Sequence, residues 1–150
     1  SLKTLRPGAE GEGADLSPEA LKVAGKNRER LGLEVRLTES DLFDKIEGTF
    51  DVIVSNPPYI KREEIESLMD EVRFHEPYMA LDGHEDGLYF YRRIVEEAPG
   101  YLRKSGGLFL EIGWDQGESV AELLRKRGFS DVKVVKDLAG LDRVVEGYYR

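Results

Sequence analysis

Cysteine is absent from this 150-residue sequence, and histidine and tryptophan are scarce, with two residues and one residue respectively. Without cysteine, the chain can form neither a disulfide framework nor a cysteine-ligated zinc site. The two histidines, His75 and His84, are not part of a histidine-rich pattern. We therefore expect no metal site.

Positively charged residues are outnumbered by negatively charged ones, and long apolar runs are also scarce. Lysine and arginine number 22 against 30 aspartates and glutamates, which gives a formal net charge of −8. This balance argues against a large nucleic-acid footprint, which generally needs a basic face. No apolar run approaches membrane-spanning length, and no signal-peptide pattern opens the sequence, so the default expectation is a cytoplasmic protein.

Apolar residues follow strand and helix patterns in turn along the chain. Helices are predicted from Ser17-Pro18 to Gly32, over 85–101 and over 116–127, and strands over 33–37, 50–55, 106–112, 132–135 and 144–149. A weaker strand is expected within 9–15, where two glycines lower the strand propensity. The alternation indicates a parallel α/β sheet. The last two strands are joined too closely for a parallel crossover, so one of them must be antiparallel to the rest.

The tetrapeptide Asn56-Pro57-Pro58-Tyr59 follows the β-branched run at 50–55, which we interpret as a buried parallel strand. Two prolines end this strand abruptly, because proline fixes φ and has no N–H to donate. The second proline also keeps the first extended. The pattern predicts a stiff loop at the carboxyl end of a strand, where open α/β sheets bind their ligands.

This loop offers the groups needed to hold a flat, neutral N–H₂ group. The nitrogen of an amide is a poor nucleophile, since its lone pair is delocalised, and two hydrogen-bond acceptors would orient it and favour its attack. The Asn56 side-chain oxygen and the Pro57 carbonyl are the candidate acceptors, with Tyr59 as an aromatic wall. Such catalysis depends on positioning and needs no charged base. The alternative is that Asn-Pro-Pro forms only a turn.

Over nearly its whole length the sequence resembles the S-adenosylmethionine-dependent methyltransferases that modify a glutamine of class 1 peptide-chain release factors. The most recognisable piece is Val54-Ser55-Asn56-Pro57-Pro58-Tyr59-Ile60, although adenine-amino DNA methyltransferases share its Asn-Pro-Pro-Tyr tetrapeptide. More specific are the stretches Phe74-His75-Glu76-Pro77, Ala80-Leu81, Gly83, Glu85-Asp86-Gly87-Leu88, Tyr91-Arg92, Glu111-Ile112-Gly113 with Gln116, and Asp137-Leu138-Ala139-Gly140 with Asp142-Arg143.

The resemblance implies a Rossmann-like class I methyltransferase sheet, mostly parallel with an antiparallel last hairpin. Members of the family begin with a helical domain, followed by a strand and a glycine-rich loop, and the sequence shows neither. Residues 1–150 are therefore interpreted as a partial methyltransferase catalytic domain. In isolation, this part is expected to bind the cofactor much more weakly than a complete homologous protein does. A gap in the sheet, where the first family strand belongs, leads us to expect self-association through the unpaired edge.

The implied cofactor is S-adenosyl-L-methionine. By resemblance, Asp15 binds its ribose hydroxyls, Asp41 with Leu42 lies at its adenine, and Asn56 also contacts it. Each acid has a plainer alternative. Asp15 could simply lead into the helix start at Ser17, and Asp41 could be an ordinary loop acid.

The implied substrate is a glutamine in a glycine-rich loop of a release factor, and neither DNA nor a membrane is an expected partner. Asn56 and Pro57 are the catalytic pair that holds the amide, and Pro58 and Tyr59 complete the substrate pocket. Glu111 is either a strand-end acid that orders the backbone or a substrate contact. Two other functions stay open: methylation of an adenine amino group in nucleic acid, and a catalytically silent binding module.

Overall fold

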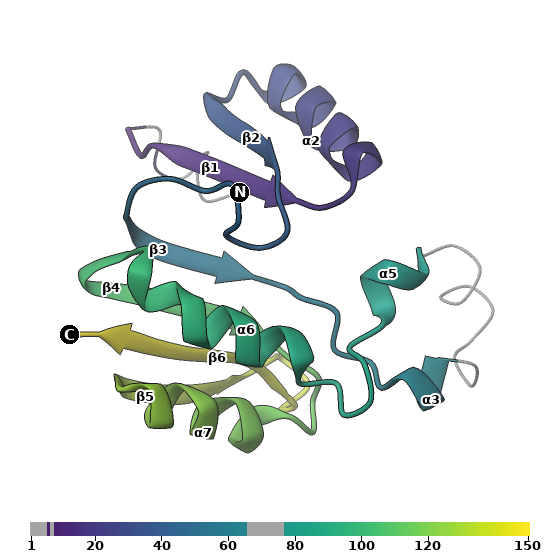
Figure 1. Cartoon of the computed structure of the whole chain (residues 1–150), viewed down its shortest axis with the longest axis vertical. Helices are drawn as coiled ribbons and strands as arrows, with labels where there is room; N and C mark the ends of the chain where they lie inside the picture. Colours follow the sequence, from purple (N-terminus) through teal and green to yellow (C-terminus); the bar gives the residue numbers. More distant parts are fainter. Residues whose placement is uncertain (1–5, 7, 66–76) are drawn as a thin grey trace. The chain divides into compact units, whose positions relative to one another are not determined.

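The computed structural model describes residue 6 and the ranges 8–65 and 77–150, and shows a mixed α/β fold (Figure 1). Two compact units make up the chain, Ser1–Gly48 and Thr49–Arg150. The described strands form two separate sheets, one in each unit. Nowhere in the described ranges does a helix have the length and apolar character needed to cross a membrane.

The first unit contains a two-stranded parallel sheet and one long helix. Strand β1 (Gly11–Asp15) pairs with β2 (Val35–Glu39), and α2 (Pro18–Leu31) connects them. Strand β2 starts two residues later than the predicted range of 33–37. The glycines of β1 fit beside larger side chains of β2, since a Cβ added to Gly13 would lie 3.2 Å from Leu37 Cδ2.

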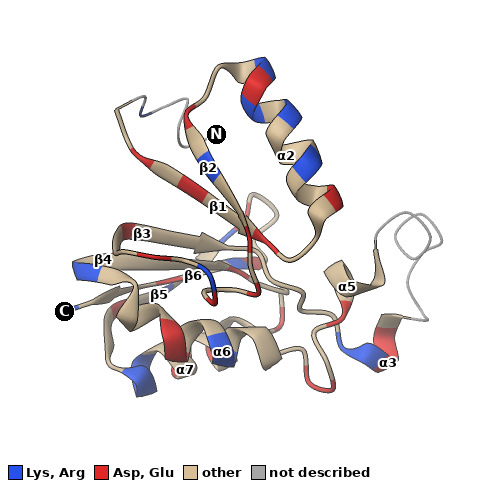
Figure 2. Cartoon of the chain, turned by 45° about the horizontal axis from the view of Figure 1, so that its top comes forward, with Lys and Arg blue, Asp and Glu red and all other residues tan. Residues whose placement is uncertain are grey.

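Helix α2 begins and ends at the predicted signals. The Ser17 hydroxyl accepts a hydrogen bond from the Ala20 N–H at 3.2 Å, which satisfies one of the unpaired donors of the first turn. Gly32 closes the helix with a φ of 60°, a left-handed conformation that glycine adopts without steric cost. Charged residues of both signs lie along the helix (Figure 2), and none of its residues is fully buried.

The second unit contains a four-stranded sheet in the order β3-β4-β6-β5. Strand β3 (Phe50–Ser55) runs parallel to β4 (Leu102–Glu111), whereas β6 (Asp142–Tyr149) is antiparallel to both β4 and β5 (Phe129–Lys136). The prediction of one reversed strand in the last hairpin is confirmed, and β6 is that strand. The carboxyl end of β3 leads directly into Asn56.

Helices α6 (Tyr89–Glu97) and α7 (Gly117–Arg127) lie side by side on one face of the four-stranded sheet (Figures 1 and 2). A 3₁₀ turn, η1 (Ala98–Gly100), follows α6. The core between the helices and the sheet includes Tyr91, Ile94, Val95, Leu108, Leu110, Val120, Leu124 and Val145. Two short helices, α3 (Arg62–Ile65) and α5 (Tyr78–Leu81), also belong to the second unit.

The prediction that the 50–55 strand is buried is wrong for one of its faces. Val52 and Val54 are 52% and 59% exposed. The strand register places Val54 beside Phe109, on the sheet face opposite to the buried Leu108 and Leu110. Helices α6 and α7 cover only the latter face, and β3 is the edge strand of this sheet. The apolar run therefore predicted the strand correctly, but it could not predict which faces of the sheet are covered by helices.

Candidate active site

The Asn56–Tyr59 loop presents its first residue to solvent and anchors the others. Asn56 is exposed, Pro57 is buried, and Pro58 and Tyr59 are half-buried. Strand β3 holds the start of the loop through its parallel pairing with β4, where Ser55 pairs with Leu110. An accessible amide side chain on a firmly held backbone is the arrangement that the sequence predicted for this loop.

The far end of the loop is fixed by main-chain hydrogen bonds. The Ile60 N–H donates to the Leu81 carbonyl at 3.1 Å, and the Gly83 N–H donates to the Ile60 carbonyl at 2.8 Å. The carbonyl of Tyr59 itself accepts a hydrogen bond from Gln116 Nε2 at 3.0 Å. The loop is therefore held at both ends by segments that lie far away in the sequence.

Two glycines allow the chain to approach Tyr59 closely. A Cβ added to Gly83 would lie 2.8 Å from both Cα and the carbonyl carbon of Tyr59. Gly87 has a φ of 71°, and a Cβ there would lie 2.5 Å from the Tyr59 oxygen and 2.7 Å from Gln116 Nε2. These glycines leave room only for a hydrogen atom, so they define the wall against which the loop packs.

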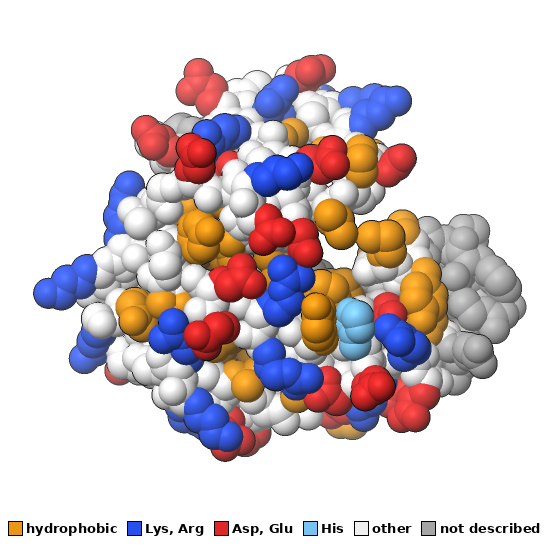
Figure 3. Space-filling model, viewed as in Figure 1, with side chains coloured by type: hydrophobic (Ala, Val, Ile, Leu, Met, Phe, Trp, Pro, Cys, Tyr) orange, Lys and Arg blue, Asp and Glu red, His pale blue; other side chains and the backbone are white. Residues whose placement is uncertain are grey.

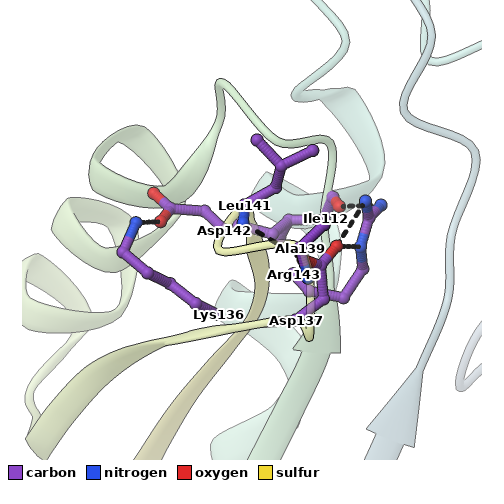
Figure 4. Close-up of polar contacts among 7 residues, drawn as sticks. All are labelled: Ile112, Lys136, Asp137, Ala139, Leu141, Asp142 and Arg143. Atoms are coloured by element: carbon purple, nitrogen blue, oxygen red, sulfur yellow. Dashed lines mark hydrogen bonds and ion pairs between the residues drawn. The ribbon is translucent and has the colours of Figure 1, made fainter.

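Asp137 and Arg143 tie the β5–β6 turn to the end of β4 (Figure 4). Arg143 donates from Nε and Nη2 to Asp137 Oδ2 at 3.3 and 3.1 Å, and from Nη1 to the Ile112 carbonyl at 3.3 Å. Asp137 Oδ1 accepts the N–H groups of Ala139 and Leu141. The Leu141 N–H and then the Arg143 guanidinium lower the pKa of Asp137, which favours its charged form.

Strand β4 ends at Glu111, whose backbone carbonyl accepts a hydrogen bond from the Tyr91 hydroxyl at 2.9 Å. Tyr91 is fully buried, and burial raises the pKa of its hydroxyl, so that the donor keeps its proton. This contact positions the end of β4 through the backbone of Glu111 and does not involve the carboxylate.

In the first unit, Asp15 lies at the carboxyl end of β1. Its Oδ1 accepts the Ser17 N–H at 2.8 Å, and its backbone carbonyl accepts the Ser40 N–H at 3.0 Å. The second contact joins the ends of the two parallel strands, because Ser40 directly follows β2. Asp15 and the turn that begins at Ser40 therefore share one edge of the sheet. The contact to Ser17 also agrees with the plainer interpretation of Asp15 as a residue that leads into α2.

Ser40 holds the turn that carries Asp41 and Leu42. Its side chain is buried, at 3% exposure, and its hydroxyl donates to the Leu42 carbonyl at 3.1 Å and accepts the Lys45 N–H at 3.0 Å. Leu42 has a φ of 49°, a left-handed conformation that an apolar side chain rarely adopts. These bonds fix the conformation of the turn, with Asp41 half-buried beside Leu42.

Acidic and basic side chains are interspersed over the face drawn in Figure 3. One ion pair lies just after the Asn56–Tyr59 loop, where Arg62 donates to Asp82 from two nitrogens, at 3.1 and 2.9 Å. Within the ranges 8–65 and 77–150, no three histidine, aspartate or glutamate side chains gather as ligands for a metal ion.

The predicted site residues fall into two groups. Asn56, Pro57, Pro58 and Tyr59 form one continuous loop of the second unit, and Asp15, Asp41 and Leu42 share an edge of the small sheet of the first unit. Phe74, His75 and Glu76 lie outside the described residues. The ring of His84 packs beside that of Tyr89, with the ring centroids 4.1 Å apart, and Trp114 is 64% exposed.

Sequence reasoning gave no role to the residues that support these groups. Gln116 and Gly83 were noted only as parts of the family resemblance, and Ser40 was given no role. For Gln116 and Gly83, the one available signal was their place in the stretches that resemble the family. Neither burial nor hydrogen-bond partners could be read from that signal.

Residues 1–83 match the family model of the methyltransferase small domain. A curated relative from Geobacter sulfurreducens, named release factor glutamine methyltransferase, is 46% identical over 148 residues, which are 98% of this chain and 52% of that protein. The chain spans about half the length of the curated relatives it matches.

Two solved structures are also similar to this chain. A methyltransferase from Pyrococcus furiosus has a TM-score of 0.71 and 23% identity, covering 98% of this chain and 66% of that one, which shows the fold alone. The protein-(glutamine-N5) methyltransferase (release factor-specific) from Alicyclobacillus acidocaldarius has a TM-score of 0.53 and 29% identity, covering 95% of this chain and 81% of that one.

Proposed function

This chain belongs to the methyltransferase small domain family, and from that premise we propose that it forms part of a protein-glutamine methyltransferase. The reaction transfers a methyl group from S-adenosyl-L-methionine to the side-chain amide nitrogen of a glutamine in a peptide-chain release factor. The names of the curated relatives support this substrate, because relatives from different bacteria are called release factor glutamine methyltransferase at 45–46% identity.

The single observation that carries the proposal is the Asn56–Tyr59 loop, with an exposed Asn56 on a backbone held at both ends. A neutral amide acceptor beside a backbone carbonyl suits an uncharged N–H₂ group. Because charge develops on that nitrogen only during attack, the useful contribution of the protein is fixed hydrogen bonding rather than a base.

The residues at the edge of the first unit fit a nucleoside. Asp15 is an exposed carboxylate at a strand end, and a carboxylate in this position can accept both hydroxyls of a ribose. The neighbouring Asp41-Leu42 turn is fixed by the buried Ser40 and offers an apolar side chain and a carboxylate to an adenine. S-adenosylmethionine, when bound, supplies a methyl group on a positively charged sulfur.

In the proposed mechanism, the side-chain oxygen of Asn56 accepts one N–H of the substrate amide and the Pro57 carbonyl accepts the other. These two bonds orient the nitrogen and increase its electron density as the new carbon–nitrogen bond forms. The bond between the methyl carbon and the sulfur would break at the same time, and its electron pair would leave the sulfur neutral. Tyr59 and Pro58 flank the flat amide and exclude water. The nitrogen loses one proton to solvent after methylation, which restores a neutral amide.

A methyl-transfer assay tests this proposal with the full-length protein. The protein is incubated with methyl-labelled S-adenosylmethionine and, separately, with a release factor, with the same factor carrying alanine in place of its loop glutamine, and with adenine-containing DNA. We expect label on the unmodified release factor only. Label on DNA and none on the release factor would contradict the protein-substrate assignment.

A further inference from the structure

Gln116 is a buried polar residue of the second unit whose side chain bonds only to backbone. It is 7% exposed and precedes α7, yet its side chain does not cap that helix. Instead, its Oε1 accepts the Gly113 N–H at 3.0 Å, and its Nε2 donates to the carbonyls of Tyr59 and Gly87 at 3.0 and 3.2 Å. One side chain thus joins three segments of the chain.

The hydrogen-bond pattern requires an amide at this position. The site presents one N–H donor and two carbonyl acceptors, and a glutamine side chain offers one acceptor oxygen and a nitrogen with two donors. A glutamate of the same shape would direct an oxygen at two carbonyl oxygens. A methionine would leave all three buried groups unpaired, which is costly in a dry interior.

The contact at Tyr59 affects Asn56 because the residues between them are stiff. Both Pro57 and Pro58 have φ fixed near −65°, so a movement of the Tyr59 backbone is transmitted along the loop rather than absorbed by it. The loop's other end is fixed by β3. Holding the Tyr59 carbonyl therefore also sets the direction of the Pro57 carbonyl and of the Asn56 side chain.

We propose that Gln116 is a positioning residue for methyl transfer, which fixes the Asn56–Tyr59 loop in the geometry that receives the substrate amide. This inference rests on the proposed function of the loop. Gln116 acts through Tyr59 and does not touch the substrate. Loss of its side-chain amide should therefore lower the rate of methyl transfer within the bound complex and leave the affinity for the cofactor unchanged.

The test compares Gln116→Glu with the parent, in the full-length protein and at a temperature where both are folded. We expect kcat for the release factor to fall at least tenfold, with the Kd for S-adenosylmethionine unchanged within about twofold. Val120→Ala is the matched control, because Val120 is fully buried one turn further along α7 and its truncation destabilises the same helix. The control should keep the parent kcat.

Hydrogen exchange at the backbone amides of Tyr59 and Ile60 gives a second readout that needs no substrate. We expect Gln116→Glu to raise these exchange rates at least tenfold, whereas Val120→Ala leaves them close to the parent values. Unchanged exchange in Gln116→Glu, or equal loss of kcat in both variants, would overturn the inference. If the parent methylates no release factor, the proposed function fails, and the exchange result alone still decides whether Gln116 fixes the loop.

Discussion

Asn56→Ala is expected to lower kcat for release-factor methylation about a hundredfold in the full-length protein. The substitution removes the side-chain oxygen that accepts one N–H of the substrate amide and adds no charge. A positioned hydrogen bond that is realised in the transition state is worth roughly 3 kcal/mol. Cofactor affinity should fall much less than kcat, because the proposed catalytic bond is to the substrate amide and the contact of Asn56 with the cofactor is only one of several implied contacts. Steady-state kinetics and calorimetric titration with S-adenosylmethionine measure the two quantities.

Two further variants separate the role of Asn56 from general effects. Asn56→Asp keeps an acceptor oxygen and should lose less activity than Asn56→Ala. Asn27→Ala removes an exposed asparagine from α2 and should retain the parent kcat. Equal activity of Asn56→Ala and the parent would remove Asn56 from the mechanism.

Gly83→Ala is expected to lower the free energy of unfolding by about 1–3 kcal/mol, the usual cost of overpacking a close contact. The added Cβ would lie 2.8 Å from the Tyr59 backbone and 2.9 Å from the Gly87 Cα. Backbone atoms cannot rotate aside as a flexible side chain can, so one of the two segments must move. The midpoint of urea unfolding at an unchanged slope gives the loss of stability.

Gly100→Ala is the matched control for this prediction. Gly100 has no atom within 4 Å of the position that a Cβ would occupy, and neither glycine requires a left-handed backbone. Its substitution should therefore change the free energy of unfolding by no more than about 0.5 kcal/mol. Equal stability losses in both variants would show that the approach of Gly83 to Tyr59 is not a tight contact.

Local signals in the sequence predicted most of the secondary structure. Ser17-Pro18 and Gly32 bound α2 because capping and left-handed closure depend on residues within one turn. The short connection before β6 required a reversed strand, since parallel crossovers need more residues. The start of the loop at Asn56 followed from the two prolines, whose effect on the backbone is equally local.

Features that depend on distant partners could not be predicted. Gln116 bonds to Tyr59 and Gly87, which are 57 and 29 residues away, and nothing beside Gln116 in the sequence indicates either contact. The exposure of Val52 depends on which strand forms the edge of the sheet and on which face the helices cover. The identity of the edge strand and the covered face are properties of the assembled sheet, whereas a β-branched run predicts only that a strand forms.

The most direct test of the central claim is a crystal structure of the full-length protein with a glutamine-containing release-factor peptide and the demethylated cofactor. The account predicts that the glutamine amide nitrogen lies about 2.7–3.2 Å from both Asn56 Oδ1 and the Pro57 carbonyl oxygen, the usual range for such hydrogen bonds. A glutamine bound with its amide nitrogen away from both oxygens would contradict it.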